Sequence, residues 1–494
     1  MQYKWVALTV TIVGTLMSGL DDRIIVIGLP TIIKQVGTTV GEGIWIGQAY
    51  TLALSFALLL VGRITDLHGR VKIYNIGFVI FTIGSGLASI SSSVAELIIF
   101  RLVQGVGASM LSANSIAIVT DATPQNELGT FIGFNRVAFR VGAVMGLTLS
   151  GVILSFTDWR ALFYINIPIG IFGTIWARRR LREVSTRDTT KKMDWVGFLT
   201  FTSGITLILV ALTFLSYGVA DSIESIAMLS SGSILLVAFV VFERKASEAP
   251  LLDLKLFKIR AFASGSTVAM FSMLAWNGMI YMASFFLQIV LGLTPLQAGL
   301  AYLFLELPYL VVGAASGKLA DKYGARGLAT VGLAILGVAC LYASAFSSST
   351  IYSSVLVLFL LLAVGQGLFT SPNQKSIMGS VPANRRGVAA GFSGTIAQVG
   401  NAAGPVLAIT LITLGIPYGV FTTLVQNAGS LATQIAKEEF VSGFKIAALT
   451  LGIVSAVAII PSYMRGKTMN GSSEDVTTKE TTATSNQDEA LPEA

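Results

Sequence analysis

The sequence has very few of the residues that most often carry out chemistry. Its 494 residues include one cysteine, Cys340, and one histidine, His68. A disulfide within the chain, a zinc cluster and a relay of histidines are therefore excluded. Residues 313–319 miss the phosphate-binding P-loop pattern, because the spacing is short and no hydroxyl residue follows Lys318. We therefore expect no enzyme, no cofactor and no metal site.

Charged residues are also scarce. They make up 12% of the chain, whereas hydrophobic residues make up 53%, and soluble domains carry about 25% charged residues. Many apolar stretches reach the roughly 20 residues that a helix needs to cross a bilayer. The composition predicts an all-α protein that crosses the membrane many times. The net charge of +7 then belongs to its loops and indicates no nucleic-acid partner.

We predict about fourteen membrane spans from the length criterion. They run near residues 5–29, 43–62, 73–92, 95–120, 128–154, 160–178, 195–217, 226–242, 261–290, 297–317, 326–345, 351–371, 387–415 and 443–463.

Alternate loops between these spans are basic, and the strongest example is the run Arg178 to Lys192. The positive-inside rule places the basic loops and both termini in the cytoplasm, so we expect a multi-pass protein of the plasma membrane. Residues 417–439 are expected to form a long outside loop. The tail after Arg465 is rich in Ser, Thr and Glu without an apolar period, which predicts disorder.

The chain also repeats itself. The segment Gly62 to Arg70 recurs as Gly317 to Arg326, and Val141-Gly142 recurs as Val399-Gly400, each about 260 residues later. Two homologous halves in parallel order describe the major facilitator fold. We expect a six-helix bundle in residues 1–182, linkers with two inserted central helices in 183–260, a second six-helix bundle in 261–465, and a disordered tail in 466–494.

Several motifs resemble those of one family, the major facilitator superfamily, and in particular its 14-span drug:proton antiporter branch. The match extends from about residue 10 to residue 410. The motifs are Leu20 to Pro30 in the first span, Gly62 to Lys72, Arg101 to Gly107 in the fourth span, Trp159-Arg160, Asn166 to Gly170, Asp194 to Gly197, Pro250 to Leu254, Pro372-Asn373 and Val381-Pro382.

The fifth-span motif of this branch is only partly present. Gly142 and Gly146 match it, but Leu147 stands in place of its proline and Ser150 in place of a later glycine. Arg23 also stands where the branch usually has a small polar residue. Both departures bear on antiport rather than on transport itself.

Ionisable residues within spans are costly and are usually functional. Asp21 and Arg101 fall at a similar depth, and the family resemblance implies a proton-coupling site and its partner. A structural ion pair is the alternative. The internal repeat aligns Arg101 with Ala363 and Arg140 with Gln398, so the arginines serve something that only one half needs.

Five other charges leave more than one interpretation open. Asp22 and Arg23 either face the cavity or pair with neighbours. Arg136 and Arg140 share one face of the fifth span, where they attract an anionic group or form packing ion pairs. Glu306 is a second proton site, a cation-recognition site or a gating contact.

Two further sets of residues complete the candidate site. The wall of the cavity is expected to include Trp276, Asn277, Tyr281 and Phe285, since aromatic faces with a few polar atoms suit amphipathic ligands; ordinary helix packing is the alternative. A cytoplasmic latch is expected in the repeated loops, with Asp66 near Arg70 and Asp321 near Arg326. Its residues are Gly62, Asp66, Gly69, Arg70, Asp321 and Arg326.

The sequence thus predicts a monomeric secondary transporter that exchanges a small hydrophobic or amphipathic compound for protons, as in multidrug efflux and drug resistance. Its partners would be a small-molecule substrate, protons and the lipid bilayer. The alternative is a facilitator or importer of an organic anion or metabolite without strict proton coupling. A membrane receptor is disfavoured, because no large ligand-binding loop or signalling domain is present.

Overall fold

The computed structural model describes residues 2–124, 127–184, 194–216, 223–245, 254–381, 386–426 and 434–465. These residues are almost entirely helical. The helices are α1 (Tyr3–Val36), α2 (Val40–His68), α3 (Arg70–Ser89), α4 (Val94–Ala122), α5 (Leu128–Phe156), α6 (Ala161–Tyr164), α7 (Asn166–Arg180), α8 (Trp195–Ser216), α9 (Ile223–Lys245), η1 (Leu254–Lys258), α10 (Arg260–Phe285), η2 (Phe286–Val290), α11 (Pro295–Ala301), α12 (Leu303–Tyr323), α13 (Ala325–Ser344), α14 (Tyr352–Gly379), α15 (Arg386–Ile412), α16 (Tyr418–Gln426) and α17 (Gln434–Met464). The predicted tail 466–494 and much of the linkers in 183–260 lie outside the described residues.

The predicted number of spans is confirmed within these ranges. Thirteen helical segments are long and apolar enough to cross a membrane, and α1, with three charges near its middle, is long enough to make a fourteenth. Large apolar side chains are exposed along the outside, among them Ile83, Ile175 and Val311. A soluble protein rarely leaves so much apolar surface in water. The chain is therefore a multi-pass membrane protein.

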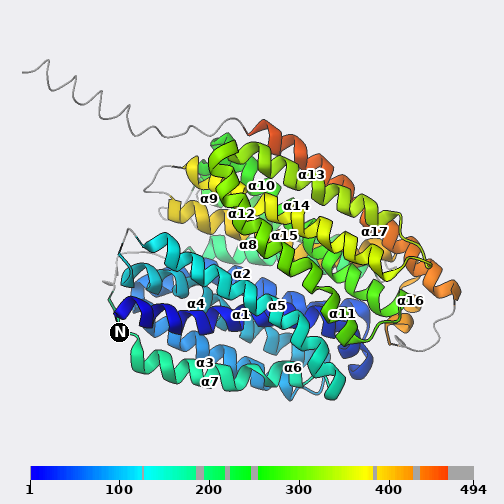
Figure 1. Cartoon of the computed structure of the whole chain (residues 1–494), viewed down its shortest axis with the longest axis horizontal. Coiled ribbons are helices and arrows are strands. Elements are labelled where there is room, and N and C mark those ends of the chain that lie inside the picture. Colours follow the sequence, from blue (N-terminus) through cyan, green and yellow to red (C-terminus); the bar gives the residue numbers. More distant parts are fainter. Residues whose placement is uncertain are drawn as a thin grey trace, which may run out of the picture.

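The helices are arranged as two bundles with their axes roughly parallel (Figure 1). In the first bundle, α1 packs against α4, α5 and α7, and α3 packs against α4. In the second, α10 packs against α14, α15 and α17, and α13 against α14. The pattern of neighbours repeats, as the sequence repeat predicts. The α8–α9 pair packs through α8 against α2 of the first bundle and α15 of the second.

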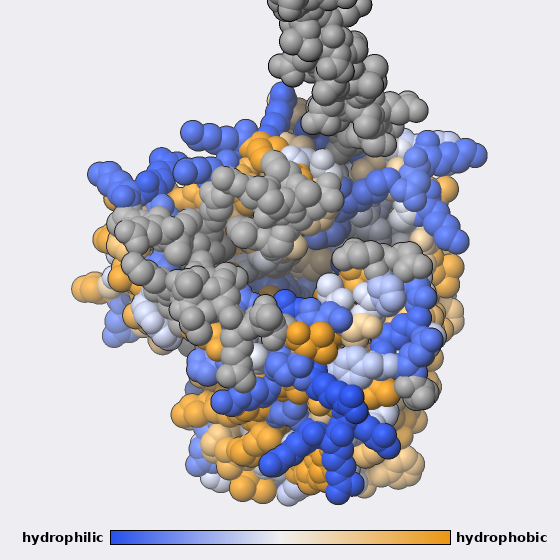
Figure 2. Space-filling model, turned by 90° about the vertical axis from the view of Figure 1, so that its left-hand side faces the viewer, coloured by the Kyte–Doolittle hydropathy of each residue, from blue (hydrophilic) through white to orange (hydrophobic). Residues whose placement is uncertain are grey.

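One end of the molecule carries α16 and the other carries the chain's N-terminus (Figure 1). We call them the α16 end and the basic end, because the helix ends at the latter carry Arg70, Lys72, Arg178, Lys318 and Arg326. Figure 2 views the basic end, where hydrophilic side chains gather and the surface is hollowed between the two bundles.

Local sequence signals account for the helix ends. Thr39 and Glu42 form a reciprocal capping box at the start of α2, and Thr294 with Gln297 forms another before α11. Gly69 and Gly324, at equivalent points of the repeated loops, have φ of 99° and 84°, which only glycine adopts readily. These glycines allow the sharp turn between consecutive helices in each half.

The structure corrects one expectation outside the spans. Residues 417–439 are not simply a loop, because they contain α16 and the first turns of α17. Tyr418 of α16 accepts a hydrogen bond from the Gly41 amide at 2.9 Å, and Gln426 donates to the Thr38 carbonyl at 2.9 Å. This short helix therefore holds the two bundles together at the α16 end.

Candidate functional site

Close glycine contacts bring α1 and α10 into place. A Cβ at Gly142 of α5 would lie 2.2 Å from the Leu16 carbonyl oxygen, and a Cβ at Gly400 of α15 would lie 2.0 Å from that of Met270. Helix backbones can touch so closely only where a side chain is absent. The two contacts also make Leu16 equivalent to Met270. Five to seven residues further on, Asp21, Asp22 and Arg23 are then equivalent to Ala275, Trp276 and Asn277.

Asp21 lies fully buried inside the first bundle and contacts Arg101 directly. Arg101 Nη1 donates to Asp21 Oδ2 at 2.5 Å, and Arg101 Nε donates to the Ile46 carbonyl at 3.1 Å. The guanidinium lies 4.2 Å from the centre of the Tyr50 ring. Two of the three residues expected in proton coupling, Asp21 and Arg101, are thus adjacent, on α1 and α4, whereas the third, Glu306, lies on α12.

Three uncharged polar residues complete this network, and sequence analysis did not single them out for it. Gln104 and Asn166 each donate to Asp21 Oδ1 at 2.9 Å. Both also donate to the Ser85 hydroxyl, at 3.1 and 3.2 Å. Gln104 could have been found as the residue one turn after Arg101 on the same face. The network therefore joins four helices, α1, α3, α4 and α7, around one carboxylate.

A second cluster lies between the two bundles. Arg23 forms an ion pair with Asp22 at 3.2 Å and donates to Asn277 Oδ1 of α10 at 3.0 Å. Because Arg23 and Asn277 are equivalent positions of the repeat, their contact lies on the axis that relates the two halves. Glu306 of α12 is 1% exposed. Neither of its carboxylate oxygens has a hydrogen-bond partner among the described residues.

Arg140 of α5 adds a second contact between the bundles, with α12. Its Nη2 donates to the Tyr309 hydroxyl of α12 at 2.6 Å, and its guanidinium lies 4.2 Å from the centre of the Tyr309 ring. Tyr309 in turn packs against Trp276, with ring centres 5.4 Å apart. The Tyr281 hydroxyl lies against Gly47 of α2, where a Cβ would come within 2.8 Å. Arg136, one turn nearer the basic end, is exposed.

One residue expected in the wall of the cavity lies elsewhere. Phe285 packs against Phe421 of α16 at 5.7 Å, beyond the cluster.

At the basic end, Arg70 pairs with Asp121 rather than Asp66, and Asp321 pairs with Lys375 rather than Arg326. Arg326 lies 4.1 Å from the Tyr463 ring. Each of these three contacts stays within one bundle, so none of them latches the two bundles together. Gly62 is exposed, with no atom near its missing side chain.

The contacts between the bundles are concentrated toward the α16 end. Ser284 donates to the Val26 carbonyl at 2.9 Å, and Gln288 donates to that of Ile27 at 3.3 Å. A Cβ at Gly299 of α11 would lie 2.8 Å from the Leu147 carbonyl oxygen of α5. Between described side chains, no hydrogen bond or ion pair joins the two bundles on the basic side of Arg140. The polar contacts between the bundles therefore gather at the α16 end, whereas the surface is hollowed between the bundles at the basic end (Figure 2).

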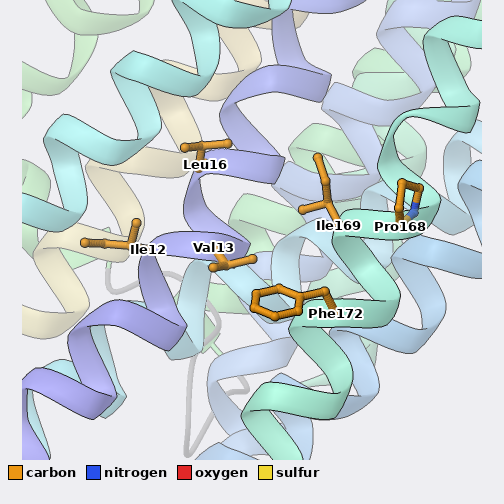
Figure 3. A pocket seen from close by; sticks show the side chains of 6 residues that line it. All are labelled: Ile12, Val13, Leu16, Pro168, Ile169 and Phe172. Carbon is orange, nitrogen blue, oxygen red and sulfur yellow. The ribbon is translucent and has the colours of Figure 1, made fainter.

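One cavity lies away from both clusters. It has a volume of about 430 Å³ and lies between α1 and α7, where Figure 3 shows six apolar side chains around it. They are Ile12, Val13, Leu16, Pro168, Ile169 and Phe172. Because Pro168 and Phe172 are exposed, the cavity opens on the outer surface of the first bundle. It contains no polar side chain that could recognise a charged group.

Comparison with known proteins gives a consistent result. The family model described as Major Facilitator Superfamily matches residues 11–405 and 265–460. Riboflavin transporter RibZ of Clostridioides difficile (strain 630) is 30% identical over 404 residues, which cover 82% of this chain and 87% of that protein. Multidrug resistance protein Stp of Mycobacterium tuberculosis (strain ATCC 25618 / H37Rv) is 31% identical over 407 residues, covering 80% of this chain and 74% of that protein.

The fold also resembles solved structures. A bacterial homologue of the human lysosomal transporter Spinster, crystallised in an inward-facing and unoccupied conformation, matches with a TM-score of 0.68 at 16% identity. The match covers 94% of this chain and 97% of that one. At this identity the likeness concerns the fold alone.

Proposed function

The chain belongs to the major facilitator superfamily of transporters, and we propose that it exports small hydrophobic or amphipathic compounds in exchange for protons. The observation that supports this most is the Asp21–Arg101 pair. It is fully buried in one bundle, and the equivalent positions of the other bundle are Ala275 and Ala363. A fold-level ion pair would be needed in both halves, so an ionisable pair in one half alone suggests a task specific to transport.

Protonation of Asp21 would act as a switch through this pair. A proton on the carboxyl group removes one charge and leaves Arg101 buried without a counter-ion. Leaving one partner of a buried pair uncompensated costs about 3–5 kcal/mol. The guanidinium would then favour a different arrangement of α1, α2 and α4, all of which it touches. The free energy of protonation is in this way available to move helices of the first bundle.

The helix α1 carries this change to the interface between the bundles. Asp21 faces the polar network of the first bundle, whereas Arg23, two residues later, reaches Asn277 of the second. A shift of α1 therefore alters the contact on the axis about which the halves would rock. In the proposed cycle, rocking closes the basic end and opens the α16 end.

The clusters and charges also support an orientation and a substrate site. We take the basic end as cytoplasmic under the positive-inside rule, in the plasma membrane, with the domain boundaries expected from the sequence. The structure would then be open toward the cytoplasm. Trp276, Tyr281, Tyr309 and Glu306 provide aromatic faces and a carboxylate without a partner, which suit an amphipathic compound. Relatives named for multidrug resistance and riboflavin transport fit this class of substrate. We propose that the protein acts as a monomer.

The alternative is a facilitator or importer of an organic anion that does not require protons. Arg23, Arg140 and the incomplete fifth-span motif favour it. Loss of transport in the presence of an uncoupler would separate proton-coupled export from this alternative.

The proposed function can be tested with purified protein in liposomes that contain a pH-sensitive dye. Under an imposed proton gradient, a panel of amphipathic compounds is added to wild type and to Asp21→Asn. We expect substrate-dependent proton flux in wild type and at least a ~10-fold lower flux in the variant. Asp158→Asn, the same change at an exposed loop residue, should leave the flux intact.

A second variant guards against misfolding. Asp21→Asn combined with Arg101→Gln removes both charges of the pair, so no uncompensated charge remains buried. It should fold and still lack proton flux. Substrate movement without proton flux, equal in wild type and in both variants, would leave the facilitator as the better account.

A further inference from the structure

The charges that face the space between the bundles do not balance. The Asp21–Arg101 pair is self-contained within the first bundle. At the interface, two acidic residues, Asp22 and Glu306, stand against three arginines, Arg23, Arg140 and Arg136. Arg23 lies beside Asp22. When all five groups are ionised, the interface therefore carries one more positive than negative charge. The excess positive charge lies on α5, which carries Arg136 and Arg140.

Arg136 faces the space between the bundles and not the lipid. The lipid-facing stripe of α5 is marked by the exposed apolar residues Phe134, Val137 and Val141. At 3.6 residues per turn, Arg136 points roughly 130° away from the centre of this stripe and only about 40° from Arg140. Arg140 reaches across to α12 of the second bundle. Arg136 is nevertheless exposed, so it borders the opening between α5 and α12.

Arg136 has no carboxylate partner among the described residues. Two acidic side chains of the basic half of the first bundle are engaged elsewhere: Asp121 pairs with Arg70, and Glu127 pairs with Lys4. On α12, the only acidic residue deeper than Asp321 is Glu306. An unpaired arginine in a narrow space with low-dielectric walls attracts anions and repels cations more strongly than it would in water.

Aromatic rings lie directly beyond this charge. Tyr309 holds the Arg140 guanidinium over its face, and its other neighbour is the Trp276 ring. A ligand that moves inward from Arg136 therefore meets Arg140 together with the tilted rings of Tyr309 and Trp276. Arginine matches carboxylate and sulfonate groups through its several donors, and the rings offer a flat apolar surface.

From this arrangement we propose that the transport pathway selects aromatic anions over cations of the same shape, with Arg136 as the residue that sets the sign. The inference shares one assumption with the proposed function, namely that the substrate passes through the space between the bundles. It does not depend on proton coupling. The proposal gives the exporter a negatively charged substrate, which is also the substrate charge of the facilitator alternative.

The test uses three probes with one ring system: 1-pyrenesulfonate as the anion, 1-pyrenemethylammonium as the cation and 1-pyrenemethanol as the neutral compound. Their dissociation constants are measured by fluorescence anisotropy with purified protein in detergent, without any proton gradient. In wild type, we expect the sulfonate to bind at least ~10-fold more tightly than the ammonium compound. In Arg136→Glu, the order should reverse.

Two control variants make the result specific. Arg136→Lys keeps the charge and should keep the order of the probes. Arg179→Glu makes the same charge change at an exposed residue of α7 outside the pathway and should leave the order unchanged. Because Arg136 is exposed, its variants are expected to fold, and thermal unfolding checks this.

Three outcomes would overturn the proposal. They are equal or tighter binding of the ammonium compound by wild type, an unchanged order in Arg136→Glu, and binding of none of the probes. Because no proton gradient is used, a failure here is distinct from a failure of proton coupling in the liposome assay.

Discussion

At the scale of single residues, two glycines set how closely the first helix of each bundle can approach its neighbour. A Cβ at Gly142 or Gly400 would lie 2.2 or 2.0 Å from a backbone oxygen of the adjacent helix. Backbone atoms cannot move aside as a flexible side chain can. We expect Gly142→Ala and Gly400→Ala each to lower the free energy of unfolding by about 1–3 kcal/mol, measured as thermal unfolding in detergent.

The same helices contain their own controls. At Gly133 of α5 and Gly391 of α15, a Cβ would have no atom of another residue within 4 Å. Alanine is a better helix former than glycine by up to about 1 kcal/mol, so Gly133→Ala and Gly391→Ala should be neutral or stabilising. A loss of stability at Gly133 equal to that at Gly142 would contradict the packing explanation.

The sequence points to the charged residues of the site more clearly than to the uncharged ones. Asp21 and Arg101 were singled out because a charge within a span is costly and therefore rarely incidental. Ser85, Gln104 and Asn166 were missed as members of their network, since uncharged polar residues occur widely in spans without a special role. The direction of Phe285 could not be predicted either, because its position in the helix was known but not the position of α16.

At the scale of elements, apolar length predicted the spans well and their ends less well. Predicted span 351–371, for instance, belongs to α14, which extends to Gly379. Backbone hydrogen bonds continue beyond the apolar stretch, because water at the membrane surface tolerates a helix with polar side chains. The helix α16 was missed since its nine residues are too few for a span and the segment was assigned to a loop.

The element that joins the bundles along one side is α8. Trp45 of α2 donates to the Thr213 hydroxyl at 3.1 Å, and Thr410 of α15 donates to the Leu212 carbonyl at 2.9 Å. Interhelical hydrogen bonds in membranes contribute about 0.6 kcal/mol on average. We expect Thr213→Val and Thr410→Val each to reduce stability by about that amount, measured by thermal unfolding in detergent.

A threonine that bonds only within its own helix provides the comparison. The Thr450 hydroxyl donates to the Ile446 carbonyl of α17 and to no neighbouring helix among the described residues. Thr450→Val should therefore have the smaller effect. If all three variants lost equal stability, the contacts of α8 would not be what holds it to both bundles.

At the scale of the whole molecule, the two bundles touch at the α16 end through α5 and α11. A Cβ at Gly299 would lie 3.7 Å from Cα of Gly151, which is close enough for a disulfide after substitution of both residues. Both added Cβ atoms would crowd a backbone oxygen, at 2.6 Å for Gly151 and 2.8 Å for Gly299, so the reduced double-cysteine variant is the reference. Relative to it, we expect oxidation of Gly151→Cys combined with Gly299→Cys to stop transport, because the α16 end could no longer open. Reduction should restore it, as measured by substrate flux into liposomes in a Cys340→Ala background.

A disulfide within one bundle tests whether crosslinking as such is harmful. A Cβ at Gly337 of α13 would lie 3.4 Å from that of Ser455 on α17. Oxidation of Gly337→Cys with Ser455→Cys should leave transport unaffected, because the two helices move together. Full transport by the oxidised Gly151–Gly299 variant would show that these ends need not separate.

The sequence repeat predicted the two bundles but not their relative position. The repeated loops, the Gly142 and Gly400 motifs and the alternation of basic loops follow from residues alone. Which end is closed depends on contacts between the bundles, such as Ser284 with Val26, whose partners are far apart in the chain. Equivalent residues such as Arg23 and Asn277 can be aligned from the repeat, but only the packing shows that they meet.

The unpaired Arg136 also has an electrical consequence. Moving one elementary charge across a membrane potential is worth about 2.3 kcal/mol per 100 mV. In a cell whose interior is negative, an exported monoanion moves with the voltage, and so does a proton that enters in exchange. On the proposed selectivity, each cycle would carry two charges in the same electrical direction. The membrane voltage would then drive export directly. It could not drive an exporter that exchanges a monovalent cation for a single proton, because that exchange moves no net charge.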